Sequence, residues 1–261
     1  MTRPLPRAPF NSSALVRFLS ENAMLHAARG SQDLGPRLGE WLNFRQAIDL
    51  HGLLEASAPT SPTTSPTTAP AAHLKRAAGV SGEALGRLVE KIRAQLTESI
   101  VQGAPPGSGL ARIDWPPAAL HAAPEPQTAF EPYRRFYAAH QRQMATAIHS
   151  LRAQVRTQLS QSTPALQQLA ALDASFESIL REREAALLGK VAKMLEKHWV
   201  QTLQALRKQP NQHLHPVAWL VPFQQHLRSA LLAELDTRLQ PTLGLLEAFQ
   251  HATPPDPEAS P

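Results

Sequence analysis

The feature that most constrains the fold is an apolar pattern that runs through residues 128–208 and is interrupted once, at 160–164. On both sides of the interruption, large apolar residues recur at every third or fourth position, which places them on one face of an α-helix. Thr163 suits the N-cap of a helix, and Pro164 suits its first position, where the missing N–H would have no partner. The pattern therefore predicts two long amphipathic helices, the second of which starts at Pro164.

Folding the chain about residues 161 and 162 brings apolar positions of the first helix opposite apolar positions of the second. We therefore predict a long antiparallel helical hairpin with coiled-coil-like packing. One layer places His140 opposite Arg183, and we expect the polar ends of both side chains to reach water. The matched apolar pairs include Val155 with Leu169, Leu151 with Leu172, Tyr137 with Leu187, and Tyr133 with Val191.

The second predicted helix is longer than the first. At about 1.5 Å per residue the two arms measure ~65 Å and ~45 Å, so the apolar face of the longer arm extends beyond the shorter one. We expect the last helix of the chain, a second copy or another protein to cover this candidate partner face. It consists of Met194, Trp199, Leu203 and Leu206.

Shorter helices are expected on either side of the hairpin. N-cap residues at 11–13 begin one that Gly30 ends, and a second runs from about 33 or 36 to 54. A third runs from its N-cap Ser81 to about 101, with Glu83 and Arg87 as an i, i+4 ion pair. A last helix covers about 217–239, and Pro241 breaks or kinks it before a short piece that ends at 249.

These segments predict an all-α fold in five parts. The short N-terminal helices cannot bury their apolar faces alone, so we expect them to pack on each other or on the hairpin. The linker and the tail are rich in proline, which lacks the main-chain N–H needed for helix and sheet hydrogen bonds. We therefore expect both segments to be disordered. The parts are an N-terminal helical pair (1–56), a Pro/Thr/Ser-rich linker (57–80), a helix plus a Pro/Gly-rich loop anchored by Ile113 and Trp115 (81–127), the hairpin with the C-terminal helices (128–251), and a tail (252–261).

The composition agrees with an all-α protein and excludes several classes. Aromatic residues make up only 5% of the chain, and no stretch alternates apolar and polar residues as a half-buried strand would. The chain has no cysteine, which excludes disulfides and thiolate metal sites and suits a cytoplasmic protein. It also lacks a run of 18 apolar residues and an apolar segment near residue 1, so we expect neither a membrane span nor a secretory signal.

Basic residues recur along the first arm of the predicted hairpin and form a candidate polyanion stripe. A stripe of this kind can follow the phosphates of a nucleic acid. The alternative is the solvated flank of an amphipathic helix, partly neutralised by Asp173, Glu177 and Glu184 of the second arm. The net charge of +5 is spread along the chain, so we favour the structural interpretation. The stripe comprises Arg135, Arg142, His149, Arg152 and Arg156.

No pattern in the sequence predicts an enzyme, a cofactor or a metal. His213 and His215, with His198 or His226, are the best candidate metal ligands, but no carboxylate lies in their turn to complete a coordination shell. Phosphate-binding glycine loops, metalloprotease helix motifs and nucleophile elbows are all missing. We therefore expect solvated turn histidines and a protein without catalytic activity.

Several segments together are similar to a known family. Phe10–Leu19 and Arg37–Leu42 open the chain, Tyr133–Arg142 and Leu166–Asp173 lie in the hairpin, and Leu231–Pro241 follows it. They resemble a bacterial family of all-helical proteins of about this length that has no known activity. The resemblance implies no catalytic residue. Genes of this family lie near genes for membrane proton-channel proteins and peptidoglycan-binding outer-membrane proteins. The resemblance therefore implies an association with those proteins.

Two functions follow from these observations as expectations. The first is a non-enzymatic scaffold or adaptor that acts through helix–helix association with itself or another protein. The partner that the resemblance implies is the assembly around a membrane proton channel. The alternative is weak binding of nucleic acid or another polyanion through the basic stripe.

Overall fold

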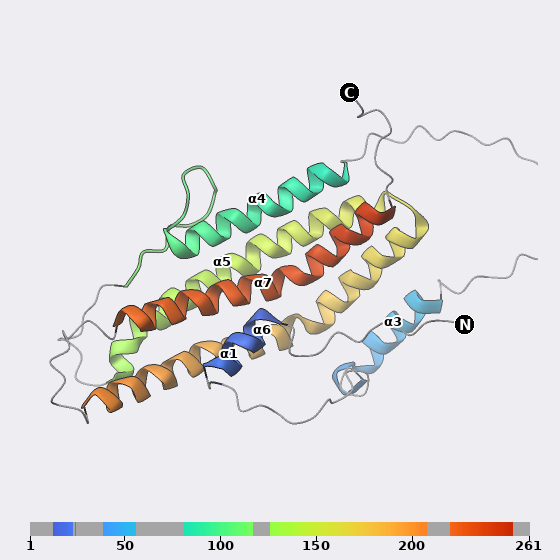
Figure 1. Ribbon diagram of the computed structural model, residues 1–261. Helices are drawn as coiled ribbons and strands as arrows, with labels where there is room; N and C mark the ends of the chain where they lie inside the picture. The colour runs from blue at the N-terminus through green and yellow to red at the C-terminus, as the bar shows by residue number, and fades with distance from the viewer. Residues whose placement is uncertain are drawn as a thin grey trace, which may run out of the picture. The chain divides into compact units, whose positions relative to one another are not determined.

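The computed structural model describes residues 13–22, 24, 39–55, 81–116, 126–207 and 220–252. All the regular secondary structure in these ranges is helical, which confirms the predicted all-α class (Figure 1). The predicted linker, and the tail beyond residue 252, lie outside the described residues. The helices are α1 (Ala14–Glu21), α3 (Phe44–Glu55), α4 (Gly82–Val101), α5 (Pro126–Ser160), α6 (Pro164–Arg207) and α7 (Leu220–Ala252).

Three of these helices begin within about two residues of their predicted starts, and a side-chain cap is present at one of them. The Ser81 hydroxyl accepts a hydrogen bond from the main-chain N–H of Ala84 at 3.2 Å, as an N-cap does. Pro164 is the first residue of α6, and α5 starts two residues before the predicted position. The Glu83–Arg87 ion pair is also present, at 3.5 Å.

The first two helices are shorter than predicted, because asparagines end one and begin the other. Asn22 caps the C-terminus of α1 with a side-chain hydrogen bond to the carbonyl of Phe18 at 2.8 Å, so α1 ends well before Gly30. Asn43 and Gln46 form a reciprocal capping box, each side chain accepting the other's main-chain N–H at 2.8 and 3.0 Å. That box starts α3 at Phe44, after a break at residues 42 and 43; residues 39–41 are also helical, and residues 33–38 lie outside the described residues.

Of the two predicted effects of Pro241, a break or a kink, the break does not occur, because the last helix continues through the proline. α7 runs from Leu220 to Ala252 with the proline inside it. A proline in a helix interior costs roughly 3 kcal/mol, since it lacks an N–H and crowds the preceding turn. Burial offsets that cost on both sides of the proline, because Leu239 is fully buried and Leu245 is 3% exposed.

The chain divides into two compact units, each made of segments that are distant in sequence. The described part of unit 1 comprises residues 13–22, 24, 90–116, 126–150, 182–207 and 220–240. The described part of unit 2 comprises residues 39–55, 81–89, 151–181 and 241–252.

The core of unit 1 centres on an aromatic cluster from α5, α6 and α7. The centroid of the Trp199 ring lies 4.6 Å from the ring centroid of Phe223 and 5.1 Å from that of Tyr133. Phe130 completes the cluster. Aromatic pairs in such edge-on and tilted geometries each contribute about 0.5–1.5 kcal/mol beyond their buried area. The cluster therefore fixes three helices against one another.

Helix α1 packs into unit 1 through one apolar side. Leu15 and Leu19 are 6% and 5% exposed, and they are four residues apart, on one face of the helix. The N-cap residue Ser13 does not bond its own helix; its hydroxyl lies 2.9 Å from that of Thr237 on α7. This short helix is thus positioned by a tertiary contact at its first turn.

Unit 2 has an aliphatic core and one close helix approach. Val89, Val155 and Leu159 are fully buried there. A Cβ atom at Gly82 would lie 3.2 Å from the Cγ of Gln250, whose amide donates a hydrogen bond to the Gly82 carbonyl at 3.3 Å. Glycine at the start of α4 therefore lets the end of α7 approach its backbone.

Candidate functional site

The carboxylate of Glu234 on α7 is a fully buried charged group of unit 1. It accepts hydrogen bonds from the Tyr137 hydroxyl at 2.8 Å, the Gln141 amide at 2.9 Å and Arg238 Nε at 2.9 Å. These partners come from α5 and from α7 itself. Charge-assisted hydrogen bonds of this kind are stronger than neutral ones, so the network ties α5 to α7.

Arg238 extends the network to α6, because its Nη1 also bonds Glu184 at 3.2 Å. Glu184 therefore forms an ion pair with Arg238. The expectation that it neutralises the basic stripe is wrong. Burial, and then the charge of Glu234, raise the pKa of Tyr137 well above its ordinary value, so this hydroxyl remains a donor. Both Glu234 oxygens have hydrogen-bond partners, so the network holds α5, α6 and α7 together in unit 1.

His140 is the second buried polar side chain on α5. It is fully buried, its ring lies 4.6 Å from the ring of Phe136, and neither of its nitrogens has a partner among the described residues. Burial lowers its pKa to about 4, so the ring is neutral. The expectation that His140 reaches water is therefore wrong, whereas Arg183 is exposed as expected. A neutral imidazole packed on a phenyl ring behaves as an apolar group.

The structure separates the predicted basic stripe into two parts. Arg152 forms a bidentate pair with Asp173 (2.9 and 2.5 Å), and Arg156 bonds both Asp173 and Glu177. Burial alone would lower the pKa of Arg156, but the bonds to Glu177 and Asp173 outweigh it and raise the pKa. The expected neutralisation by Asp173 and Glu177 is confirmed.

The other three members of the stripe, Arg135, Arg142 and His149, are exposed. Arg135 is 80% exposed in its side chain and pairs with Glu131 at 3.0 Å, one turn earlier. An exposed i, i+4 pair of this kind contributes only about 0.3–0.5 kcal/mol. Only this part of the stripe can meet a polyanion without breaking a buried ion pair.

Replacing Asp173 with alanine is expected to destabilise the protein, since it leaves Arg152 and Arg156 without their shared carboxylate. Both arginines are at most 15% exposed in their side chains, so the loss should be about 2 kcal/mol in the free energy of unfolding. Urea unfolding followed by circular dichroism measures it. Arg135→Ala is the matched control and should change stability by less than about 0.5 kcal/mol. Equal effects of the two changes would contradict this structural role.

The predicted partner face on α6 is covered, at least in part, within the chain. Trp199 is 1% exposed and packs on Phe223 of α7, so the last helix covers it. Met194 and Leu203 are partly exposed. The side chain of Leu206 lies outside the described residues. One register assignment on this helix is wrong, because Leu187 is 55% exposed and Leu188 is buried in its place.

Of the candidate metal ligands, the structure brings His198 and His226 together. Their rings, from α6 and α7, have centroids 5.6 Å apart and an interplanar angle of 73°. Burial, and then the neighbouring His226, lower the pKa of His198. Among the described residues, no three histidine, aspartate or glutamate side chains cluster as metal ligands would. His213 and His215 lie outside the described residues.

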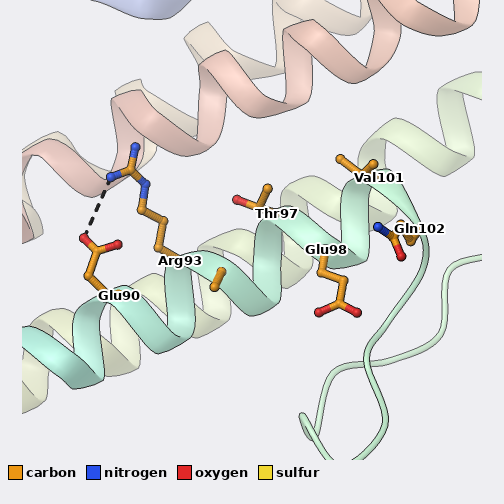
Figure 2. A pocket seen from close by; sticks show the side chains of 7 residues that line it. Glu90, Arg93, Thr97, Glu98, Val101 and Gln102 are labelled. Carbon is orange, nitrogen blue, oxygen red and sulfur yellow. Dashed lines mark ion pairs between the residues drawn. The ribbon is translucent and has the colours of Figure 1, made fainter.

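Hollows of similar size lie at the loop after α4 and on α4 itself, both in unit 1. A cavity of about 450 Å³ lies at the loop after α4, where Trp115 packs edge-on against Phe136 (4.5 Å) and stacks on the guanidinium of Arg228 (4.6 Å). Trp115 therefore anchors this loop, as predicted. A second hollow of about 470 Å³ lies on α4 (Figure 2). The Arg93 guanidinium in this hollow already pairs with Glu90 at 3.8 Å and with Asp236 at 3.0 Å.

The comparisons with known proteins identify the family. The model of the family described as "Protein of unknown function (DUF3348)" matches residues 1–251. The chain belongs to the DUF3348 family. No curated protein and no solved structure matches it.

In this DUF3348 protein, α3 combines a small buried side with large exposed apolar residues. Leu50 is its one buried residue, and the amide of Gln168 on α6 donates to the carbonyl of Leu53 at 3.2 Å. Phe44 is 83% exposed and Ile48 is 54% exposed. They are four residues apart, on one face of the helix.

Phe44 and Ile48 belong to none of the polar networks or hollows described above. Large aromatic side chains exposed to this degree are typical of surfaces that bind other proteins, especially when a second apolar residue lies beside them. None of the described helices is both long enough and apolar enough to cross a lipid bilayer.

Proposed function

We propose that this DUF3348 protein is a non-enzymatic helical adaptor that binds another protein through the exposed face of α3. The observation that carries the proposal is the pair Phe44 and Ile48, one helical turn apart, with 83% and 54% of their surfaces exposed. Burial of a phenylalanine removes about 150–250 Å² from water, which makes it a typical anchor of a protein interface.

The support of α3 suits this role. The capping box of Asn43 and Gln46 begins the helix immediately before Phe44, and Leu50 with the Gln168 contact holds it to unit 2. A supported helix offers its apolar residues without a large loss of conformational entropy on binding. An amphipathic helix of the partner, packed across Phe44 and Ile48, is the recognition mode that this surface favours.

The proposal includes the antiparallel packing of α5 against α6 within each unit. The ion pairs of Arg152 and Arg156 with Asp173 and Glu177 support such an arrangement in unit 2. In unit 1, Arg134 bonds Glu196 at 2.7 Å, and the Gln141 amide donates to the Leu188 carbonyl at 3.1 Å. A cytoplasmic protein of the assembly around a membrane proton channel is the first partner to test.

The test is a crosslinked, nuclease-treated pull-down from the native cell, read by mass spectrometry. It compares the unchanged protein, F44S/I48S, and the matched control R45S/D49S, which alters two exposed charged residues of the same helix. We expect partners to be recovered with the unchanged protein and the control. F44S/I48S should reduce recovery about tenfold or more, because each anchor contributes about 1–2 kcal/mol or more. Its melting temperature should not change, since both residues are exposed.

Two outcomes would count against the proposal. If F44S/I48S recovers the same proteins in the same amounts, α3 is not the binding surface. If recovery depends on nucleic acid and disappears with nuclease, polyanion binding through Arg135, Arg142 and His149 replaces the adaptor function. In that case the affinity would fall steeply as salt is raised.

A further inference from the structure

We propose that His198 and His226 bind a divalent transition-metal ion, zinc being the best match, between α6 and α7. The two imidazoles come from different helices of unit 1 and meet with their ring centroids 5.6 Å apart. Imidazole nitrogens are common ligands of zinc and of neighbouring first-row metals. The site is independent of α3 and of the adaptor function.

The separation of the rings matches the geometry of a shared ion. A zinc ion lies about 2.0–2.1 Å from a ligating nitrogen and therefore about 3.2 Å from the ring centre. Two such ligands at a tetrahedral angle have ring centres about 5.2 Å apart, and two at a linear angle about 6.4 Å apart. The observed 5.6 Å lies between these values and close to the tetrahedral one. The rings are in a T-shaped contact at an interplanar angle of 73°, so coordination requires them to rotate until one nitrogen of each faces the ion.

The surroundings leave the two rings available. Both histidines are partly exposed, so an ion can reach them from solvent. The neighbouring Thr202 hydroxyl bonds the main-chain carbonyl of His198 and not its ring. Two protein ligands leave the remaining coordination positions to water or to a ligand from solution. The result is an open site, unlike the closed four-ligand sites of structural zinc.

A bound ion would also stabilise unit 1. Trp199 follows His198 directly, and Phe223 lies three residues before His226, so the ion would link the two helices beside their aromatic contact. Binding to the folded state alone raises stability with free metal concentration. At a hundredfold excess of free zinc over the dissociation constant, the melting temperature should rise by about 5–10 °C.

The test uses the full chain without a histidine tag, stripped of metal with a chelator and then dialysed. Zinc chloride is titrated into it calorimetrically, and thermal melts are recorded with and without zinc. We expect one ion per chain and the rise in melting temperature given above. His198→Gln and His226→Gln, made separately, should each weaken binding about tenfold or more and abolish the rise, since each removes a direct ligand. His251→Gln, at an exposed histidine, should change neither.

Three results would overturn the proposal. Absence of zinc binding at the expected stoichiometry is the first. Retention of binding by both His198→Gln and His226→Gln is the second, and it would identify an adventitious ion only. Loss of binding in H213Q/H215Q, with no effect of the two single changes, would place the metal on the segment between α6 and α7 instead.

Discussion

Replacing Glu234 with alanine is expected to lower the free energy of unfolding by about 3–5 kcal/mol. The change removes the one acceptor shared by Tyr137, Gln141 and Arg238, and it leaves Arg238 as a nearly buried cation whose side chain is only 11% exposed. Arg238 keeps the ion pair with Glu184 at 3.2 Å, but that carboxylate is 47% exposed, so the buried guanidinium loses its buried counter-charge. Urea unfolding at pH 7.5, monitored by far-ultraviolet circular dichroism, measures the loss.

A double change separates the stranded charge from the loss of packing. E234M/R238M removes both charges and keeps apolar volume at both positions, so it should be less destabilised than E234M alone. Tyr137→Phe deletes a single hydrogen bond and should cost about 1 kcal/mol. If E234A lies within 1 kcal/mol of the unchanged protein, the network does not stabilise unit 1 in the way that its geometry indicates.

Acid should destabilise the protein through His140. Its pKa is about 4 in the folded protein against an ordinary value of 6.5, so between these values only the unfolded chain takes up the proton. The contribution of a neutral His140 to stability is complete above pH 6.5 and is lost as the pH falls towards 4. Over that window the loss should reach roughly 3 kcal/mol, from about 1.4 kcal/mol for each pH unit.

The leucine variant isolates this contribution from those of other acid-sensitive groups. His140→Leu keeps an apolar group against Phe136 and cannot be protonated. The difference in unfolding free energy between pH 7.5 and pH 4.5 should therefore be smaller for the variant than for the unchanged protein, by about 2–3 kcal/mol. Parallel pH profiles would show that His140 is not neutral in the folded state.

The helix positions were the most predictable part of this fold. Ser81 and Pro164 act within one or two turns of themselves, so local sequence determines where α4 and α6 begin. The start of α3 was also readable, since Asn43 and Gln46 have the spacing of a capping box, but the longer apolar pattern upstream obscured it. Pro241 shows the reverse case, in which burial of leucines on both sides outweighs a local breaking signal.

The inward-facing side of each helix was harder to predict. Leu187 and Leu188 fit a helical period almost equally well, and only the neighbouring helices decide which one is buried. Glu234 carried a signal that was overlooked: it continues the apolar series of Leu227 and Leu231, and Arg238 follows it by four residues. A carboxylate within an apolar stripe, next to a cation one turn later, indicates a buried network. His140, as a lone polar residue among apolar ones, likewise indicated a buried polar side chain.

The long helices make the two units inseparable at the level of the gene. α4, α5, α6 and α7 each contribute residues to both units, and the boundary in α7 falls at Pro241. No single cut in the chain separates the two units. Any contiguous fragment that contains one complete unit also contains part of the other. Domain dissection by truncation should therefore yield fragments that cannot bury a full core, and each unit must form from segments that are synthesised far apart in time. Point substitutions, and not deletions, are the way to assign roles within this protein.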